Sequence, residues 1–184
     1  MNVTIRRAVT RDVSGIRRLI DTYSQERRLL SKATVALYEA VQEFWVAVRD
    51  SDGALLGCGA LHVMWEDLAE IRTVAVAPDV RGNKIGHRIV TELLATAASL
   101  GVRRVFCLTF ETDFFAGFGF RAIDGAPVPH KVFEELLRSY DEGVAEFLDL
   151  ERVKPNTLGN TRMLLHLDPA GRAYPAGPAH LDAA

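Results

Sequence analysis

The sequence predicts an α/β domain, and three observations carry this prediction. Strand-like runs of β-branched and apolar residues alternate along the chain with segments of helical periodicity. The segment Glu70–Phe110 contains a strand, a helix and a second strand, an order that implies a right-handed parallel crossover. The turn Arg49–Gly53 lies between two further strands and implies antiparallel pairing. At 184 residues, the chain is long enough for one domain with a substantial core.

In the N-terminal part, we expect a strand, two helices and two further strands. Apolar and basic residues alternate over Val3–Val9, as in a strand. The next helix has a stripe of inward-facing residues, namely Val13, Ile16, Leu19, Ile20 and Tyr23. A second helix is expected over Ala33–Gln42, and strands over Phe44–Val48 and Ala54–Met64.

In the central part, Glu70–Ala77 is a run of β-branched and small residues that ends at Pro78 and Asp79, as a buried strand does. The following segment IGHRIVTELLATAASL has apolar residues at helical spacing, in a stripe wide enough for a helix that lies on a sheet. Gly101 is suited to end this helix, and Val102–Phe110 has the composition of another buried strand.

In the C-terminal part of the chain, the sequence predicts shorter helices and strands. Helices are expected over Phe114–Phe118 and Pro127–Leu137, a short helical or extended piece over Glu142–Leu150, and a closing strand over Arg162–Leu167. Residues 168–184 are rich in Pro, Gly and Ala and have little to bury, so we expect a disordered tail. These expectations place the domain at residues 1–167.

Composition excludes several classes of function. The net charge of −2 gives no electrostatic argument for binding nucleic acid or an anionic membrane surface. We find no apolar run long enough to cross a bilayer and no secretory signal at the N-terminus, so a cytoplasmic location is expected. Cys58 and Cys107 lie in strand-like apolar segments and read as buried, reduced thiols, and the spacing of Cys and His predicts no metal site.

The loop after the central strand favours an anion. It leads into a helix, where backbone N–H groups without intrahelical partners and the helix dipole attract negative charge. Gly82 and Gly86 allow a close approach of backbone to phosphate, and Arg81 and Lys84 add positive charge. A solvated basic loop in an ordinary strand–turn–helix unit is the alternative.

The strand end and the loop together carry a more specific pattern. Val74, Val76 and Pro78 are followed by Arg81 and Gly86. This pattern resembles the acetyl-CoA-binding motif of the GNAT-type N-acetyltransferase superfamily, Arg/Gln-x-x-Gly-x-Gly/Ala after a V-x-V-x-P strand end. The resemblance implies a mixed, mostly antiparallel central sheet with helices on both faces, in which a parallel strand pair splays apart at the acetyl-CoA site. It also implies acetyl-CoA as co-substrate and no metal.

The resemblance assigns the coenzyme contacts residue by residue. They are Val74, Ala75, Val76, Arg81, Gly82, Asn83, Lys84, Ile85 and Gly86. Lys84 departs from the family pattern, because it stands at the position of the first motif glycine. Since a helix-opening residue needs no positive φ, we expect the Lys84 N–H still to point at phosphate.

A second landmark of the superfamily is similar to the stretch FFAGFGF. Many members have a tyrosine at the position of Phe115, and its hydroxyl can protonate the departing thiolate. Phe115 lacks this hydroxyl, as in the amino-acid acetyltransferase branch, so the resemblance implies at most a contact between Phe115 and the pantetheine arm. Core packing is the expected role of the other phenylalanines in the stretch.

The central strand carries two charged residues among apolar ones. Since side chains alternate across a strand, we expect Glu70, Arg72, Val74 and Val76 to share one face. Buried charges are costly unless they are paired or functional. Transfer of an acyl group to an amine needs a base for the ammonium proton and a donor for the developing oxyanion. By resemblance, Glu70 is the base, with a pKa raised by burial, and the backbone N–H near Val74 is the donor.

The whole chain, over roughly residues 3 to 167, resembles the short, single-domain amino-acid N-acetyltransferases that act as N-acetylglutamate synthases. The resemblance implies acetyl transfer to the α-amino group of L-glutamate or L-glutamine, the first step of arginine biosynthesis. A guanidinium such as that of Arg72 can bind a carboxylate in bidentate fashion, although a structural Glu70–Arg72 salt bridge is the alternative. Further acceptor contacts are expected from Lys32, Tyr38, Lys154, Asn160 and Thr161.

Two other functions stay open. The acceptor could be another amine, such as a protein N-terminus, a lysine or a polyamine, although Arg72 and Lys154 disfavour a cationic substrate. The chain could instead be a regulatory module that binds acetyl-CoA without turnover, although the presence of Glu70 disfavours this. A homodimer is plausible if the edge of the final strand is exposed.

Overall fold

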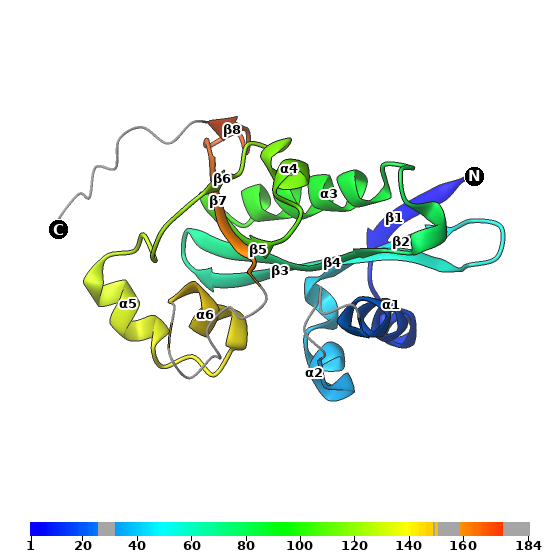
Figure 1. The fold of residues 1–184 in the computed structure, drawn as a ribbon, viewed down its shortest axis with the longest axis horizontal. Helices are drawn as coiled ribbons and strands as arrows, with labels where there is room; N and C mark the ends of the chain where they lie inside the picture. The colour runs from blue at the N-terminus through cyan, green and yellow to red at the C-terminus, as the bar shows by residue number, and fades with distance from the viewer. Residues whose placement is uncertain (26–31, 149, 151–158, 175–184) are drawn as a thin grey trace. The chain divides into compact units, whose positions relative to one another are not determined.

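The computed structural model describes residues 1–25, 32–148, 150 and 159–174 (Figure 1). The chain divides into two compact units, which we describe one at a time. Unit 1 comprises Met1–His62 and Ile71–Thr96, and unit 2 comprises Val63–Glu70 and Ala97–Ala184.

The strands form a mixed sheet. They are β1 (Val3–Arg7), β2 (Phe44–Arg49), β3 (Leu55–Trp65), β4 (Leu68–Val76), β5 (Arg104–Thr109), β6 (Arg121–Ala122), β7 (Thr161–Leu167) and β8 (Ala173–Tyr174). Hydrogen-bonded neighbours follow the order β1-β2-β3-β4-β5-β7-β6, and β8 pairs with β7. Strand β4 runs parallel to β5, whereas β2 with β3 and β7 with its partners pair antiparallel. The predicted sheet, mostly antiparallel with one parallel pair, is confirmed.

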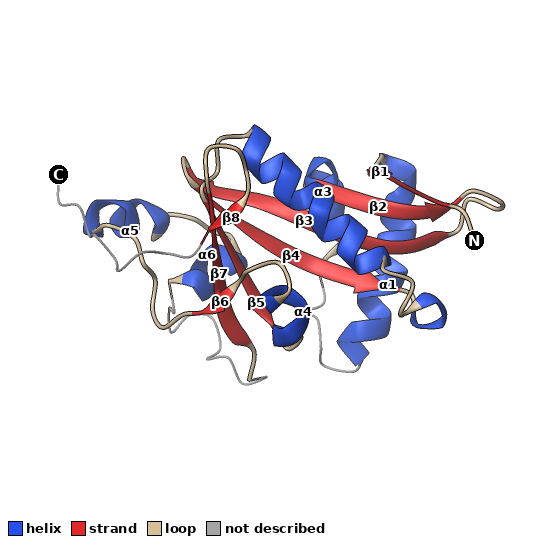
Figure 2. Ribbon diagram, turned by 90° about the horizontal axis from the view of Figure 1, so that it is seen from above, coloured by secondary structure: helices blue, strands red, loops and turns tan. Residues whose placement is uncertain are grey.

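Unit 1 places helices on both faces of its strands. The helices α1 (Val13–Gln25) and α2 (Thr34–Glu39) lie below the sheet and α3 (Ile85–Ser99) lies above it (Figures 1 and 2). Three short 3-10 turns connect these elements, namely η1 (Thr10–Asp12), η2 (Val41–Glu43) and η3 (Pro78–Val80). The hairpin turn before β3 ends at Gly53, which has a φ of 70° and donates its N–H to Arg49 O at 2.9 Å.

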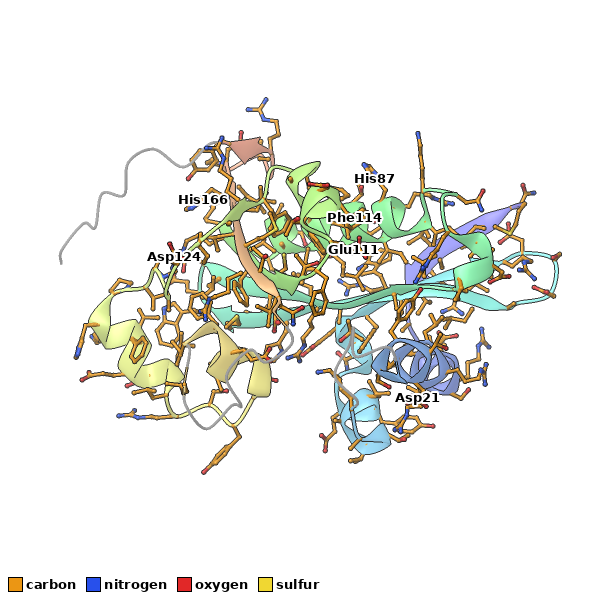
Figure 3. The ribbon with its side chains drawn as sticks, viewed as in Figure 1. Asp21, His87, Glu111, Phe114, Asp124 and His166 are labelled. Atoms are coloured by element: carbon orange, nitrogen blue, oxygen red, sulfur yellow. The ribbon has the colours of Figure 1, made fainter. Side chains whose placement is uncertain are left out.

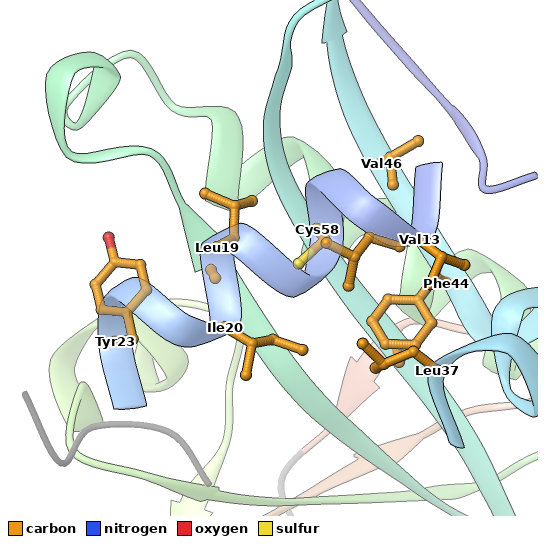
Figure 4. Packing of buried hydrophobic residues seen from close by; sticks show 11 residues of the cluster. Val13, Leu19, Ile20, Tyr23, Leu37, Phe44, Val46 and Cys58 are labelled. Atoms are coloured by element: carbon orange, nitrogen blue, oxygen red, sulfur yellow. The ribbon is translucent and has the colours of Figure 1, made fainter. Parts of the chain in front are cut away.

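The core of unit 1 forms because the predicted stripe of α1 packs on β2 and β3. Its buried members are Val13, Ile16, Leu19, Ile20, Tyr23, Leu37, Phe44, Val46, Cys58, Ala60 and Ala75 (Figure 4). On the other face, Gly57 and Gly59 allow α3 to approach β3 closely. A Cβ on Gly59 would lie 2.9 Å from Ile89 and 3.0 Å from Leu93, so any larger residue there would push α3 away.

Unit 2 is built on the start of β4 and on β5. Their parallel pairing runs over Leu68–Glu70 and Arg104–Phe106. Among its described residues, this unit has the short helices α4 (Thr112–Ala116), α5 (His130–Leu136) and α6 (Glu142–Phe147). Its buried core cluster consists of Met64, Leu68, Phe106, Leu136, Val144, Phe147, Leu148 and Leu164. The rings of Phe106 and Phe147 meet edge to face, with centroids 5.1 Å apart, and thereby hold α6 against β5.

The predicted disordered tail is wrong for its first part. Residues 168–174 form a turn and the short strand β8, in which Ala173 pairs with Leu167 and Tyr174 with His166. The Asp168 carboxylate organises this turn, because it accepts the N–H groups of Ala170 and Arg172, each at 2.8 Å. Residues 175–184 lie outside the described residues, and the domain limit at residue 167 stays a prediction.

Candidate functional site

The predicted coenzyme loop lies in unit 1, between the end of β4 and the start of α3. Strand β4 ends at Val76, the turn η3 follows, and α3 begins at Ile85. Gly82 has a φ of 84°, and a Cβ built on it would meet no atom within 4 Å. Because the first N–H groups of a helix have no intrahelical acceptor, this open loop fits a phosphate group. The strand, the loop and the helix follow one another as the sequence predicted, with Arg81 and Lys84 exposed on the loop, and phosphate binding there stays a prediction.

Lys84 contradicts one expectation about this loop. We expected no positive φ at this position, but the φ of Lys84 is 57°. A side chain with a Cβ is disfavoured in this left-handed region by about 1–2 kcal/mol, whereas glycine is not. The tight entry into α3 thus explains why the family pattern has glycine here, and Lys84 adopts the same backbone conformation with strain.

Tyr23 contacts the loop from α1, which sequence reasoning missed. Its hydroxyl donates to Val76 O and accepts two hydrogen bonds from Arg81, from Nε at 3.2 Å and from Nη2 at 2.9 Å. The Arg81 guanidinium carbon also lies 5.2 Å from the centre of the Tyr23 ring. Figure 4 shows Tyr23 at the edge of the core cluster. The helical periodicity of α1 predicted only that Tyr23 is buried. It does not indicate which groups form hydrogen bonds with the Tyr23 hydroxyl.

Strand β4 is irregular at Thr73. This residue has a φ of 58°, which is rare for a β-branched side chain. Such a conformation is typical of a β-bulge, which reverses the alternation of the strand. Before Thr73, the Arg72 side chain contacts Glu43 of η2. Val41 of the same turn packs against the core cluster that contains the buried residues of α1. After Thr73, Val74 approaches α3, because its Cγ2 lies 3.4 Å from a Cβ built on Gly59. The prediction that Arg72 and Val74 share one face is therefore wrong.

Arg72 takes part in a charged cluster within unit 1. Its Nη2 donates to Glu43 Oε2 at 3.0 Å, while Glu43 Oε1 lies 2.7 Å from His62 Nδ1. Burial by itself raises the pKa of Glu43, but the hydrogen bond to His62 and the charge of Arg72 outweigh it and lower that pKa. The Arg72 side chain is 12% exposed. The cluster holds a nearly buried guanidinium in a defined position.

Glu70 lies in unit 2, in the part of β4 that pairs with β5. It is 4% exposed, so the expected burial of this carboxyl group is observed, and its role as a base stays a prediction. Gly143 of α6 faces it so closely that a Cβ on Gly143 would lie 2.2 Å from Glu70 Oε2. Cys107 is a buried neighbour whose pKa is raised by burial and by the charge of Glu70. Burial also raises the pKa of Cys58, to about 12, so both thiols are poor nucleophiles as expected.

The remaining predicted residues have simpler surroundings. Phe115 is 5% exposed and stacks edge to face on Phe114, which Figure 3 labels, and on Phe120, at 5.1 and 5.3 Å. Its ring therefore belongs to an aromatic cluster in unit 2, and its contact with the pantetheine arm stays a prediction. Thr161 is the first residue of β7, paired with Thr109, and Asn160 precedes it.

Two acceptor candidates lie in unit 1. The carbonyl of Lys32 accepts a hydrogen bond of 2.9 Å from Arg17 of α1, and Tyr38 of α2 is about half exposed. Lys154 lies outside the described residues. Within the residues that the structure describes, we find no group of three or more His, Cys, Asp or Glu side chains that could hold a metal ion. None of the described helices is long and apolar enough to span a membrane.

The comparison with known families decides the identity of this fold. The family described as "Acetyltransferase (GNAT) family" matches residues 14–120, which is more than half of the chain. The chain belongs to this family. It is therefore an acyltransferase with the GNAT fold, and the family that the loop motif resembled is confirmed.

Individual relatives of this GNAT protein are similar over most of its length. An amino-acid acetyltransferase of Mycobacterium tuberculosis is 61% identical over 164 residues, which cover 89% of this chain and 94% of the relative. An amino-acid acetyltransferase of Neisseria meningitidis is 31% identical over 129 residues, which cover 69% of this chain but 29% of the relative.

Solved structures show the same likeness. A Mycobacterium tuberculosis protein in complex with CoA and a second ligand has a TM-score of 0.86 at 60% identity, covering 90% of this chain and 99% of that one. N-acetylglutamate synthase from Neisseria gonorrhoeae, complexed with coenzyme A and N-acetyl-glutamate, has a TM-score of 0.70 at 23% identity. It covers 94% of this chain and 35% of that one, and this likeness concerns the fold.

Proposed function

We propose that this chain transfers the acetyl group of acetyl-CoA to the α-amino group of an amino acid, with L-glutamate or L-glutamine as acceptor. The observation that carries the proposal is the buried Glu70 carboxylate on the central strand of a GNAT fold. The 61% identity to an amino-acid acetyltransferase supports an amino acid as acceptor. Such a reaction would place the protein at the first step of arginine biosynthesis, in the cytoplasm.

The residues of unit 1 would hold the coenzyme. The backbone of Val74–Val76 would bind the pantetheine arm, and the loop from Arg81 to Gly86 would bind the pyrophosphate. The open backbone at Gly82 and the first N–H groups of α3 support this assignment, with Arg81 and Lys84 as cationic contacts. Bound acetyl-CoA supplies a thioester with an electrophilic carbonyl carbon and a thiolate leaving group.

Glu70 would act as the general base. An amino acid carries an ammonium group at neutral pH, which cannot attack a carbonyl until it loses a proton. Glu70 would accept this proton, directly or through one water molecule. The free amine would then form the new C–N bond while the C–S bond breaks. Cys58 and Cys107 would take no part, since both thiols resist ionisation.

The oxyanion donor would be the backbone N–H of Val74. This group follows Thr73, whose left-handed conformation breaks the regular strand geometry. A bulge re-aims the groups next to it and releases them from the ladder, which is the condition for an N–H that must face a reacting carbonyl. Backbone strain at a β-branched residue such as Thr73 is often found at functional sites, and this supports a role for this part of β4 in the reaction.

Arg72 would bind a carboxylate of the acceptor. Its Nη2 donates to Glu43, which fixes the orientation of the guanidinium, and the planar fork of a guanidinium suits a carboxylate. Asn160, Thr161, Lys32, Tyr38 and Lys154 stay as predicted additional contacts. A homodimer also stays a prediction, although β7 does not offer the free edge that we expected, because it pairs with β5 on one side and with β6 and β8 on the other.

The decisive experiment measures thiol release from acetyl-CoA with the twenty amino acids, lysine peptides and spermidine as acceptors. We expect turnover with glutamate, glutamine or both, and none with the cationic amines. Turnover with cationic amines instead would overturn the acceptor assignment while keeping the acetyltransferase. Calorimetric CoA binding without turnover on any acceptor would favour the regulatory module that binds acetyl-CoA.

A further inference from the structure

The Tyr23 hydroxyl has every hydrogen-bonding capacity engaged. A phenol can donate one hydrogen bond and accept two. Tyr23 donates to the carbonyl of Val76 and accepts Nε–H and Nη2–H of Arg81. With 7% of the residue exposed, the hydroxyl forms these bonds where water competes little. A position with this bonding is specific for tyrosine, since phenylalanine would fill the same space without the bonds.

The two partners of Tyr23 belong to two different segments of the candidate coenzyme site. Val76 is the last residue of β4, and Ala77 after it is fixed to β3 by its N–H bond to Leu56 O at 2.8 Å. Arg81 lies beyond the turn η3, on the exposed loop. Tyr23 therefore ties a fixed strand end to a long side chain on an exposed loop.

We propose that Tyr23 is a positioning residue for the coenzyme, which holds the Arg81 guanidinium ready for the pyrophosphate. This inference rests on the proposed function only in taking the loop as the pyrophosphate site. The cost of ordering a rotamer-rich side chain at binding is removed when the side chain is already held in place. The ring adds to this, because it lies under the guanidinium at 5.2 Å from its central carbon.

The test compares the binding of CoA with that of pantetheine, which lacks the pyrophosphate, by calorimetry on the full chain. We expect Tyr23→Phe to weaken CoA binding by about three- to tenfold and to leave pantetheine binding nearly unchanged. In an Arg81→Ala background, Tyr23→Phe should have no further effect on CoA binding, because Tyr23 acts through Arg81. Tyr140→Phe is the matched control, since Tyr140 is 97% exposed and loses the same hydroxyl.

Three outcomes would overturn the inference. An equal loss for CoA and pantetheine would show that Tyr23 only supports the strand end. A full additional loss in the Arg81→Ala background would show that it acts independently of Arg81. Tighter CoA binding by Tyr23→Phe would show that Tyr23 withholds Arg81 from the coenzyme.

A second variant covers the case in which Tyr23→Phe does not fold, which the unfolding midpoint without ligand would reveal. Arg81→Lys keeps the charge but loses the planar fork that donates to Tyr23 twice, so it should also weaken CoA binding selectively. An unchanged CoA affinity would count against the inference. None of these measurements needs an amino-acid acceptor, so a wrong acceptor assignment would not change their result. A wild-type protein that binds no CoA would instead refute the proposed function itself.

Discussion

Each unit holds one acidic residue that matters for the proposed chemistry, and their surroundings differ. Glu43 in unit 1 lies between two basic side chains, His62 and Arg72, and has a lowered pKa. Glu70 in unit 2 is 4% exposed and lies against Gly143, and its charge contributes to the raised pKa of Cys107. An acid with a lowered pKa is a weak base. Glu43 therefore suits the orientation of Arg72, and the proposed proton transfer is left to Glu70.

The largest expected effect is on turnover. Glu70→Gln should lower kcat by about 10²-fold or more with little change in CoA affinity, because an amide cannot accept the ammonium proton. The parallel variant Glu43→Gln should leave kcat near the wild-type value. Rates measured at saturating substrates across pH check both. Wild-type rates in Glu70→Gln, or an equal loss in Glu43→Gln, would reject the separation of roles.

Arg72→Ala should act on the acceptor. We expect the KM for the amino acid to rise by about 10- to 100-fold, since a charge-assisted contact to a carboxylate is lost, while CoA affinity stays the same. Arg72→Lys should raise the KM for the amino acid less than Arg72→Ala does, because lysine keeps the positive charge but lacks the planar guanidinium. Steady-state kinetics with varied amino acid provide the measurement. An unchanged KM would leave Arg72 with a structural role beside Glu43.

Gly143→Ala should disturb Glu70 without unfolding unit 2. The added Cβ would lie 2.2 Å from Glu70 Oε2, and the flexible carboxylate end must move away. Because a small misplacement of a reacting group is costly, we expect kcat to fall roughly tenfold. Alanine favours a helix over glycine, so the unfolding midpoint should change little. In a Glu70→Gln background the same substitution should have little further effect on kcat, and an additional tenfold loss there would refute the steric link.

The smallest effect concerns stability in acid. Because the folded-state pKa of Glu43 is lowered, its stabilising contribution is complete above its ordinary value of 4.5 and is lost as the pH falls through the lowered pKa. Relative to Glu43→Gln, the wild-type free energy of unfolding should therefore decrease on acidification by an extra amount on the order of 1 kcal/mol. Denaturant titrations of both proteins at several pH values measure this. Parallel curves would show that the pairs with His62 and Arg72 contribute nothing net.

Local pattern was sufficient for much of the fold. The stripe Val13–Tyr23 predicted the buried side of α1, and the strand end before Pro78 predicted the loop and α3, because these signals depend on residues close in sequence. Short elements were missed where the pattern is too brief to read, as for β6 and β8, each two residues long. The Pro- and Gly-rich composition after Leu167 concealed a turn that a single carboxylate, Asp168, organises.

The sequence by itself determined the family, through its motifs, and the order of the longer strands and helices, through periodicity and short-range spacing. Only the tertiary structure decided the backbone conformations of Thr73 and Lys84 and the partners of the charged groups. Arg81 meets Tyr23 across 58 positions, and Arg72 meets Glu43 across 29. Such contacts depend on how distant segments pack and on the backbone conformation at Thr73, and neither is encoded in local spacing.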